Sequence, residues 1–180
     1  TNLYGSIPIL SNAEVPGLID TTVQFFDKNK SDSKFPQLST NHFRDLLELC
    51  LTSDTYLHNG KSYKQSQGVA MGNSAAPPLA IIYMDNIEQE IFNRTDSIVY
   101  WKRYIDDIFF VTSSTPDSLL SLCNSINKSI IFTMELPTNS KIPFLDTLVS
   151  WCSITVTFTF ELYIKDLHSG TCLPYTSHVP

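Results

Sequence analysis

Two short apolar runs that flank an acidic turn constrain the fold of this chain more than any other feature. The runs are Ile98 to Trp101 and Ile108 to Val111, and the turn between them contains Asp106 and Asp107. Runs of β-branched and aromatic residues around a short polar break predict a β-hairpin. We therefore expect an antiparallel sheet with two adjacent carboxylates at the tip of one hairpin.

A second hairpin is predicted closer to the N-terminus. The segments 55–58 and 61–65 are joined by Asn59-Gly60. Asn-Gly readily adopts the two positive φ angles of a type I′ turn, which suits a two-residue hairpin connection.

Apolar residues recur at helical spacing between and beside these hairpins. The predicted helices span residues 12 to about 29, 40 to about 53, 75 to 92 and 115 to about 128. Asn12 and Thr40 are expected to cap the first two helices, and Thr115 with Pro116 to open the fourth. Three more strands are predicted at 130–135, 144–151 and 155–163. A mixture of helices and antiparallel strands predicts the α+β class.

Burial on two of these helices follows from the same spacing. The residues expected to face the core are Phe43, Leu46, Leu47 and Cys50 in the second helix, and Leu79, Ile82, Ile87 and Ile91 in the third.

Composition is that of a globular protein and limits the function classes. The 180 residues are 42% hydrophobic and 17% charged, and they fit one domain. The net charge of −6 argues against a surface that grips nucleic acid by itself. The four cysteines show no CxxC pair or zinc-ligand spacing, which favours reduced intracellular thiols. No apolar run approaches the roughly 20 residues of a membrane span, so no membrane partner is expected.

The adjacent aspartates admit two interpretations. Neighbouring carboxylates repel each other, and a divalent cation would relieve that repulsion. Because successive side chains of a strand point to opposite faces, we expect Asp106 to bind a metal directly and Asp107 to act through water or a supporting contact. The alternative is that Asp-Asp is an ordinary turn dipeptide.

The turn does not stand alone. Tyr104-Ile105-Asp106-Asp107 resembles the YxDD box of reverse transcriptases, and the stretch from Gln67 to Pro77 resembles the glycine loop and helix start of the same enzymes. The resemblance covers essentially the whole chain and is greatest to the Penelope-like retroelement branch. Further stretches that resemble this branch are 1–8, 63–65, 101–104, 131–135, 143–146, 163–165 and 177–180.

This resemblance implies a polymerase palm, an antiparallel sheet with packed helices, together with part of the fingers and the start of the thumb. It assigns residues 1–165 to the fingers and palm core and 166–180 to the thumb connection. Asp106 and Asp107 would be catalytic and would hold two Mg²⁺ ions, with Mn²⁺ as a substitute. The residues implied to contact nucleotide or template are Tyr4, Gln67, Gly68, Met71, Gly72 and Tyr104. The residues implied to shape the primer grip are Phe144, Leu145 and Asp146.

The implied partners are an RNA template, a DNA primer and dNTPs, with the remaining fingers, thumb and endonuclease domain of a parent chain, in the nucleus. The family's first catalytic aspartate is expected just upstream of Thr1, so the 180 residues alone are not expected to polymerise. Two alternatives stay open. One is a telomerase-related or intron-type reverse transcriptase. The other is an inactive remnant kept as a binding or structural module, which the acidic net charge, the loose match near Lys165, and Asn73 in place of the family's frequent serine favour.

Overall fold

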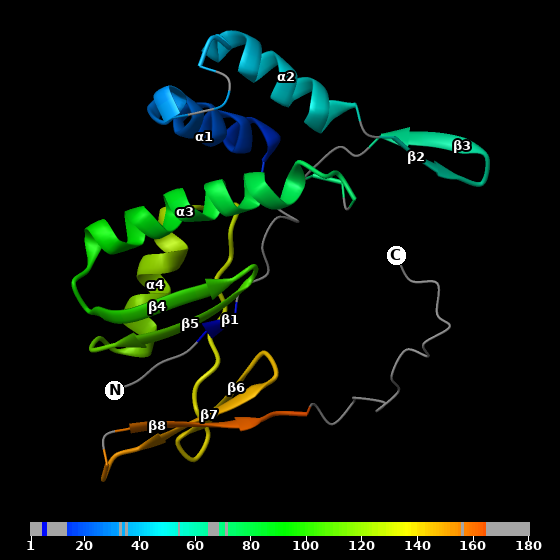
Figure 1. The fold of residues 1–180 in the computed structure, drawn as a ribbon. Helices are drawn as coiled ribbons and strands as arrows, with labels where there is room; N and C mark the ends of the chain where they lie inside the picture. Colours follow the sequence, from blue (N-terminus) through cyan, green and yellow to red (C-terminus); the bar gives the residue numbers. More distant parts are fainter. Residues whose placement is uncertain are drawn as a thin grey trace. The chain divides into compact units, whose positions relative to one another are not determined.

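The computed structural model describes residues 5–6, 14–32, 34, 36–53, 55–64, 69–70, 72–155 and 157–164. These residues form helices and small antiparallel sheets, which confirms the predicted α+β class (Figure 1). The chain divides into two compact units, Thr1–Glu135 and Leu136–Pro180. No helix within the described ranges is long and apolar enough to cross a membrane.

The first unit contains most of the secondary structure. Its helices are α1 (Val15–Lys28), the 3₁₀ helix η1 (Lys30–Asp32), α2 (Thr40–Thr52), α3 (Ala76–Arg94) and α4 (Pro116–Ile126). Its strands are β1 (Gly5–Ser6), β2 (Thr55–His58), β3 (Lys61–Lys64), β4 (Ile98–Tyr104) and β5 (Asp107–Thr112). The second unit contains β6 (Lys141–Phe144), β7 (Thr147–Cys152) and β8 (Thr157–Leu162).

The first helix begins later than predicted, and the second begins one residue earlier. Glu14 occupies the N-cap of α1, and the expected cap, Asn12, lies outside the described residues. In α2 the prediction that Thr40 is the N-cap was wrong. Ser39 is the N-cap, and its hydroxyl accepts a hydrogen bond from the backbone N–H of His42 at 3.1 Å. Serine one residue earlier satisfies the same unpaired backbone donors of the first turn.

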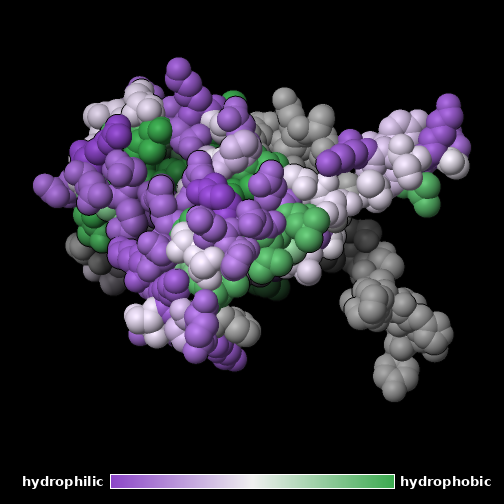
Figure 2. All heavy atoms as spheres, turned by 90° about the horizontal axis from the view of Figure 1, so that it is seen from above, coloured by the Kyte–Doolittle hydropathy of each residue, from purple (hydrophilic) through white to green (hydrophobic). Residues whose placement is uncertain are grey.

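The buried face of α2 also differs from the prediction. Leu47 and Leu51 are buried, whereas Leu46 and Cys50 are exposed. The contact with α1 determines which residues of α2 are buried. In this contact the Phe26 and Phe43 rings stack with centroids 4.1 Å apart. A rotation of one residue around a helix moves the buried position by about 100°. Figure 2, which looks down on these two helices, shows mainly hydrophilic side chains on their outer side.

The hairpin of β2 and β3 is confirmed in position and turn type. Tyr56 lies opposite Tyr63 in the register, and their rings stack at 5.5 Å. Asn59 and Gly60 both have positive φ, 49° and 73°, as a type I′ turn requires.

Strands β1, β5 and β4 form an antiparallel sheet in that order, and helices α3 and α4 lie against one of its faces (Figure 1). A bulge between Ile98 and Tyr100 leaves Val99 73% exposed and turns Ile98 back toward the core. Trp101 and Phe110 lie opposite each other on the buried face, with ring centroids 5.5 Å apart. The sheet therefore has one face in the core and one open face.

In the third helix, Leu79, Ile87 and Ile91 are buried as predicted, but Ile82 is only half-buried and Tyr83 is buried beside them. The buried side chains of α3 pack with those of α1, α2, β5, α4 and the 130–132 segment in one cluster. This cluster is the core of the first unit.

The strand predicted at 130–135 is not formed as a ladder. Ile130 and Phe132 are buried at alternate positions, as in a strand, but the backbone of Phe132 is bonded to a side chain. The amide of Asn124 accepts from the Phe132 N–H at 2.8 Å and donates to its carbonyl at 3.1 Å. An asparagine side chain can replace a neighbouring peptide in this way because it carries both a donor and an acceptor.

The second unit is a three-stranded antiparallel sheet in the order β6, β7, β8. The strand predicted at 144–151 is confirmed from Thr147 onward as β7. Its start was wrong, because the chain reverses at Leu145-Asp146 and Phe144, the last residue of β6, pairs with Thr147. Leu145 has a φ of 53°, which a continuous strand does not contain. The last predicted strand is confirmed as β8.

Candidate functional site

The acidic turn lies at the tip of the hairpin formed by β4 and β5. Tyr104 pairs with Asp107, so the two turn residues are Ile105 and Asp106. Ile105 has a φ of 53°, whereas Asp106 is not among the residues with positive φ. A positive φ at the first turn residue alone is typical of a type II′ turn, where glycine is the usual residue.

Successive side chains of the strands beside the turn point to opposite faces of the sheet. Trp101 and Arg103 point toward α3, so Tyr104 lies on the opposite, open face, where it is 58% exposed. Asp107, its cross-strand partner, shares that face and is half-buried, while Asp106 is exposed in the turn. The N-terminal strand β1 lies next to β5 in this sheet, and its Ser6 pairs with Asp107.

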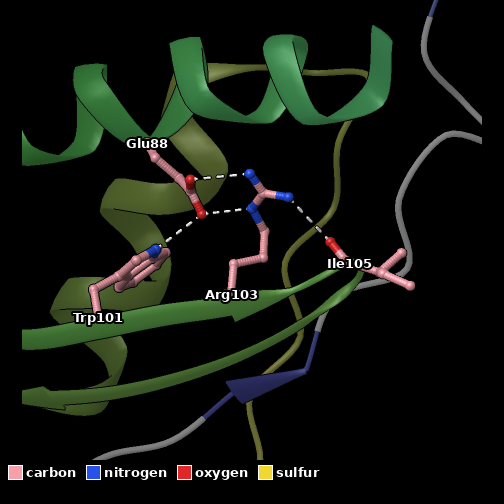
Figure 3. Close-up of polar contacts among 4 residues, drawn as sticks. All are labelled: Glu88, Trp101, Arg103 and Ile105. Carbon is pink, nitrogen blue, oxygen red and sulfur yellow. Dashed lines mark hydrogen bonds and ion pairs between the residues drawn. The ribbon is translucent and has the colours of Figure 1, made fainter. Parts of the chain in front are cut away.

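A buried acid supports the hairpin from the other face. Glu88 of α3 is 7% exposed, and its carboxylate accepts three hydrogen bonds, as Figure 3 shows. Arg103 donates two of them in a fork, from Nε at 2.8 Å and from a terminal nitrogen at 3.3 Å. Trp101 donates the third from Nε1 at 2.9 Å. A forked arginine–carboxylate pair fixes the orientation of both groups as well as their separation.

The same arginine reaches the turn itself. The other terminal nitrogen of Arg103 donates to the backbone carbonyl of Ile105 at 3.3 Å (Figure 3). Residue patterns in the sequence did not identify Glu88. The available signal was an acid on the buried stripe of α3, between Met84 and Ile91, because a buried charge needs a partner.

Several residues implied to contact nucleotide or template cannot be placed. Tyr4, Gln67, Gly68 and Met71 lie outside the described residues. Gly72 is described and has a φ of 101°, a conformation that other residues rarely adopt, and open space surrounds the position of a Cβ. Backbone conformation, rather than crowding, is therefore the reason for glycine at this position.

Asn73, which stands where the reverse transcriptase family often has serine, joins two helices of the first unit. Its amide nitrogen donates to the Cys50 carbonyl near the end of α2 at 2.9 Å, and its oxygen accepts from the Ala75 N–H at 2.9 Å. These bonds join the last turn of α2 to the start of α3. A local bond to the backbone two residues later is characteristic of asparagine.

The residues implied to shape the primer grip lie in the second unit. Phe144 and Leu145 are half-buried, and Asp146 is exposed at the turn between β6 and β7. The Asp146 carbonyl accepts a hydrogen bond from the Tyr163 N–H at 2.8 Å, which joins this turn to the end of β8.

A small apolar pocket lies behind the sheet of the first unit, between β5, α4 and the 130–134 segment. Its volume is about 20 Å³, which leaves room for about one water molecule and none for a nucleotide base. Cys123 lines this pocket, and burial raises the pKa of its thiol to about 11.

The aspartates of the turn are suitable ligands for magnesium. Mg²⁺ in enzymes is commonly held by one or two carboxylates, with water and substrate phosphates completing its coordination. Asp106 and Asp107 offer two such carboxylates at an accessible tip. Among the residues that the structure describes, no three His, Cys, Asp or Glu side chains converge on one point. Comparison with known proteins adds no assignment. No model of a known family matches this chain, and no curated protein matches it.

Proposed function

We propose that this chain is the palm of an RNA-directed DNA polymerase of the Penelope-like type. The observation that carries the proposal is the Asp106-Asp107 pair at the tip of a hairpin whose open face is accessible and whose other face is packed in the core. The segment Tyr104-Ile105-Asp106-Asp107 resembles the YxDD box of reverse transcriptases, and this resemblance supplies the reaction class.

In the proposed reaction the primer 3′-oxygen attacks the α-phosphorus of a dNTP, and pyrophosphate leaves. Two Mg²⁺ ions, when bound, lower the pKa of the 3′-hydroxyl and neutralise charge on the leaving pyrophosphate. Asp106 and Asp107 would hold these ions, since both carboxylates lie at the tip of the hairpin. Tyr104 lies on the same face as Asp107 and would present its ring to the nucleotide or template.

One further observation supports this proposal. The N-terminal segment that resembles the first palm motif is adjacent to the acidic hairpin, through the pairing of Gly5-Ser6 with Ile108 and Asp107.

The partners follow from the same proposal. They are an RNA template, a DNA primer and dNTPs, and the site of action is the nucleus. The net charge of −6 implies that other parts of a longer polypeptide supply the basic surface along the nucleic-acid backbone. A GIY-YIG endonuclease domain in that polypeptide would distinguish the Penelope-like type from telomerase-related and intron-type enzymes.

Replacing Asp106 by asparagine tests the proposal. In the full-length protein that contains this chain, Asp106→Asn should reduce DNA primer extension on an RNA template by more than about 1,000-fold, because the amide cannot neutralise a metal ion. Far-UV circular dichroism should stay unchanged, since Asp106 is exposed.

Asp96→Asn is the matched control, because Asp96 is an exposed aspartate before the other end of the same hairpin. This variant should extend the primer at the wild-type rate. Extension by Asp106→Asn at the wild-type rate would remove Asp106 from the site. A wild-type protein without activity in Mg²⁺ or Mn²⁺ would favour the inactive remnant.

A further inference from the structure

Glu88 is an unexpected residue at its position in α3. The neighbouring buried positions of this helix carry apolar side chains such as Met84, Ile87 and Ile91. Desolvating an acid and an arginine is unfavourable, and apolar residues of similar size often stabilise a protein as well or better. The ion pair with Arg103 therefore calls for a role beyond stability.

The contacts of Arg103 indicate that role. Glu88 holds two of its guanidinium nitrogens, and both side chains of the pair are nearly buried, at 9% and 12% exposure. The planar guanidinium is rigid, so fixing one edge of it also fixes the direction of the remaining nitrogen. That nitrogen donates to the Ile105 carbonyl at 3.3 Å.

The backbone conformation of Ile105 is the unfavourable part of the turn. Its φ of 53° is unfavourable for a β-branched side chain, and such conformations persist only where the surroundings determine them. Its side chain is 67% exposed, so burial contributes little to holding it. The bond to its carbonyl is a contact that joins this conformation to the core.

We propose that Glu88 is a positioning residue for the acidic turn, which acts through Arg103 and the Ile105 carbonyl. Asp106 follows Ile105 directly in the turn, so the backbone at Ile105 sets the direction of the Asp106 carboxylate beside Asp107, which the pairing with Tyr104 and Ser6 holds in the sheet. The catalytic consequence rests on the proposed polymerase function. The conformational consequence does not.

The first experiment measures the turn without any activity assay. Arg103→Lys keeps a positive charge beside Glu88, but one ammonium group cannot reproduce the fork and also reach the Ile105 carbonyl. In the 180-residue chain, the ¹³Cα and ¹³Cβ shifts of Ile105 should report positive φ in the wild type and should move toward extended values in Arg103→Lys.

Leu145 provides an internal control, because it has the same φ of 53° in a turn of the second unit. Its shifts should not change in Arg103→Lys. If the Ile105 shifts also stay at their wild-type values in a folded Arg103→Lys chain, the proposal is wrong.

A paired replacement covers the case in which Arg103→Lys fails to fold. Glu88→Gln combined with Arg103→Met removes both buried charges and keeps an acceptor for the indole N–H of Trp101. The same movement of the Ile105 shifts is expected. Wild-type Ile105 shifts in this double variant would also overturn the proposal.

The second experiment measures catalysis in the full-length protein. Arg103→Lys should lower kcat for dNTP incorporation by about 10- to 100-fold with little change in KM, because a displaced carboxylate affects the reacting groups more than substrate binding. Unchanged kcat with displaced Ile105 shifts would refute the catalytic consequence. An inactive wild type whose Ile105 shifts respond to Arg103→Lys would refute the proposed function and leave the positioning by Glu88 intact.

Discussion

At the scale of single residues, Ile105 combines an unfavourable backbone angle with an exposed side chain. A left-handed conformation destabilises a non-glycine residue by roughly 1–2 kcal/mol, and asparagine tolerates it better than isoleucine. Ile105 has a φ of 53° and is 67% exposed. The turn therefore contains strain that substitution at this one position can release.

Ile105→Asn should raise the free energy of unfolding by up to about 1 kcal/mol, because it relieves this strain while removing little buried apolar surface. Urea unfolding followed by circular dichroism measures the change. Ile131→Asn is the control, since Ile131 is similarly exposed at 58% and is not among the residues with positive φ. Equal effects of the two substitutions would argue against strain at Ile105.

Cys123 gives a second prediction for single residues, on the dependence of stability on pH. Burial raises the pKa of this thiol from 9.0 to about 11, so the folded state retains a proton that the unfolded state loses above pH 9. The stabilisation is fully present below pH 9 and decreases as the pH rises toward 11, by about 3 kcal/mol.

Urea midpoints between pH 8 and pH 11 should therefore fall less in Cys123→Ala than in the wild type, whatever the variant's stability at pH 8. Identical pH profiles would exclude Cys123 as a cause. Mass spectrometry after brief alkylation gives an independent check, since the exposed Cys50 should react before Cys123.

At the scale of elements, the two hairpins that carry aspartates use the same turn. Ile105-Asp106 and Leu145-Asp146 each place a positive φ of 53° at the first residue and an aspartate at the second. The turn geometry alone therefore does not distinguish a metal site from a connection. What differs is the ion pair of Glu88 and Arg103 behind the first turn.

The side chain of Asn124 makes the hydrogen bonds to the Phe132 backbone that a neighbouring strand would otherwise make. Asn124→Ala should destabilise the chain by about 1–3 kcal/mol, because it removes both partners of the backbone of the buried Phe132. Chemical unfolding measures the loss. Ser125→Ala, at the next position of α4, should change stability by less than about 0.5 kcal/mol, since its hydroxyl bond to Leu122 is exposed. A loss from Asn124→Ala no larger than that of Ser125→Ala would contradict this role.

At the scale of the whole molecule, the core cluster of the first unit draws all its side chains from residues 15–134. Each unit also contains one of the two tryptophans, Trp101 in β4 and Trp151 in β7. Their fluorescence can therefore report on each unit separately.

A chain ending at Glu135 should unfold cooperatively in urea, with the same midpoint as the first unit of the longer chain. The comparison uses Trp101 fluorescence in the shortened chain and in the 180-residue chain with Trp151→Phe, so that one tryptophan reports in both. A broad transition or a clearly lower midpoint in the shortened chain would show that residues after Glu135 are needed for this core.

The sequence by itself determined the α+β class, the Asn59-Gly60 turn, the acidic hairpin and the approximate bounds of four helices. These features depend on local periodicity and turn chemistry, which residues close in sequence specify. The reversal at Leu145-Asp146 was not predicted, because a positive φ in leucine has no local sequence signal.

Tertiary structure alone decided which side chains support the acidic turn. Glu88 and Arg103 are 15 residues apart, and only the packing of α3 on the sheet brings the carboxylate to the guanidinium. The same holds for Asn124 and Phe132, which replace a predicted ladder with side-chain bonds. Such contacts depend on how elements pack, and local sequence patterns do not encode packing.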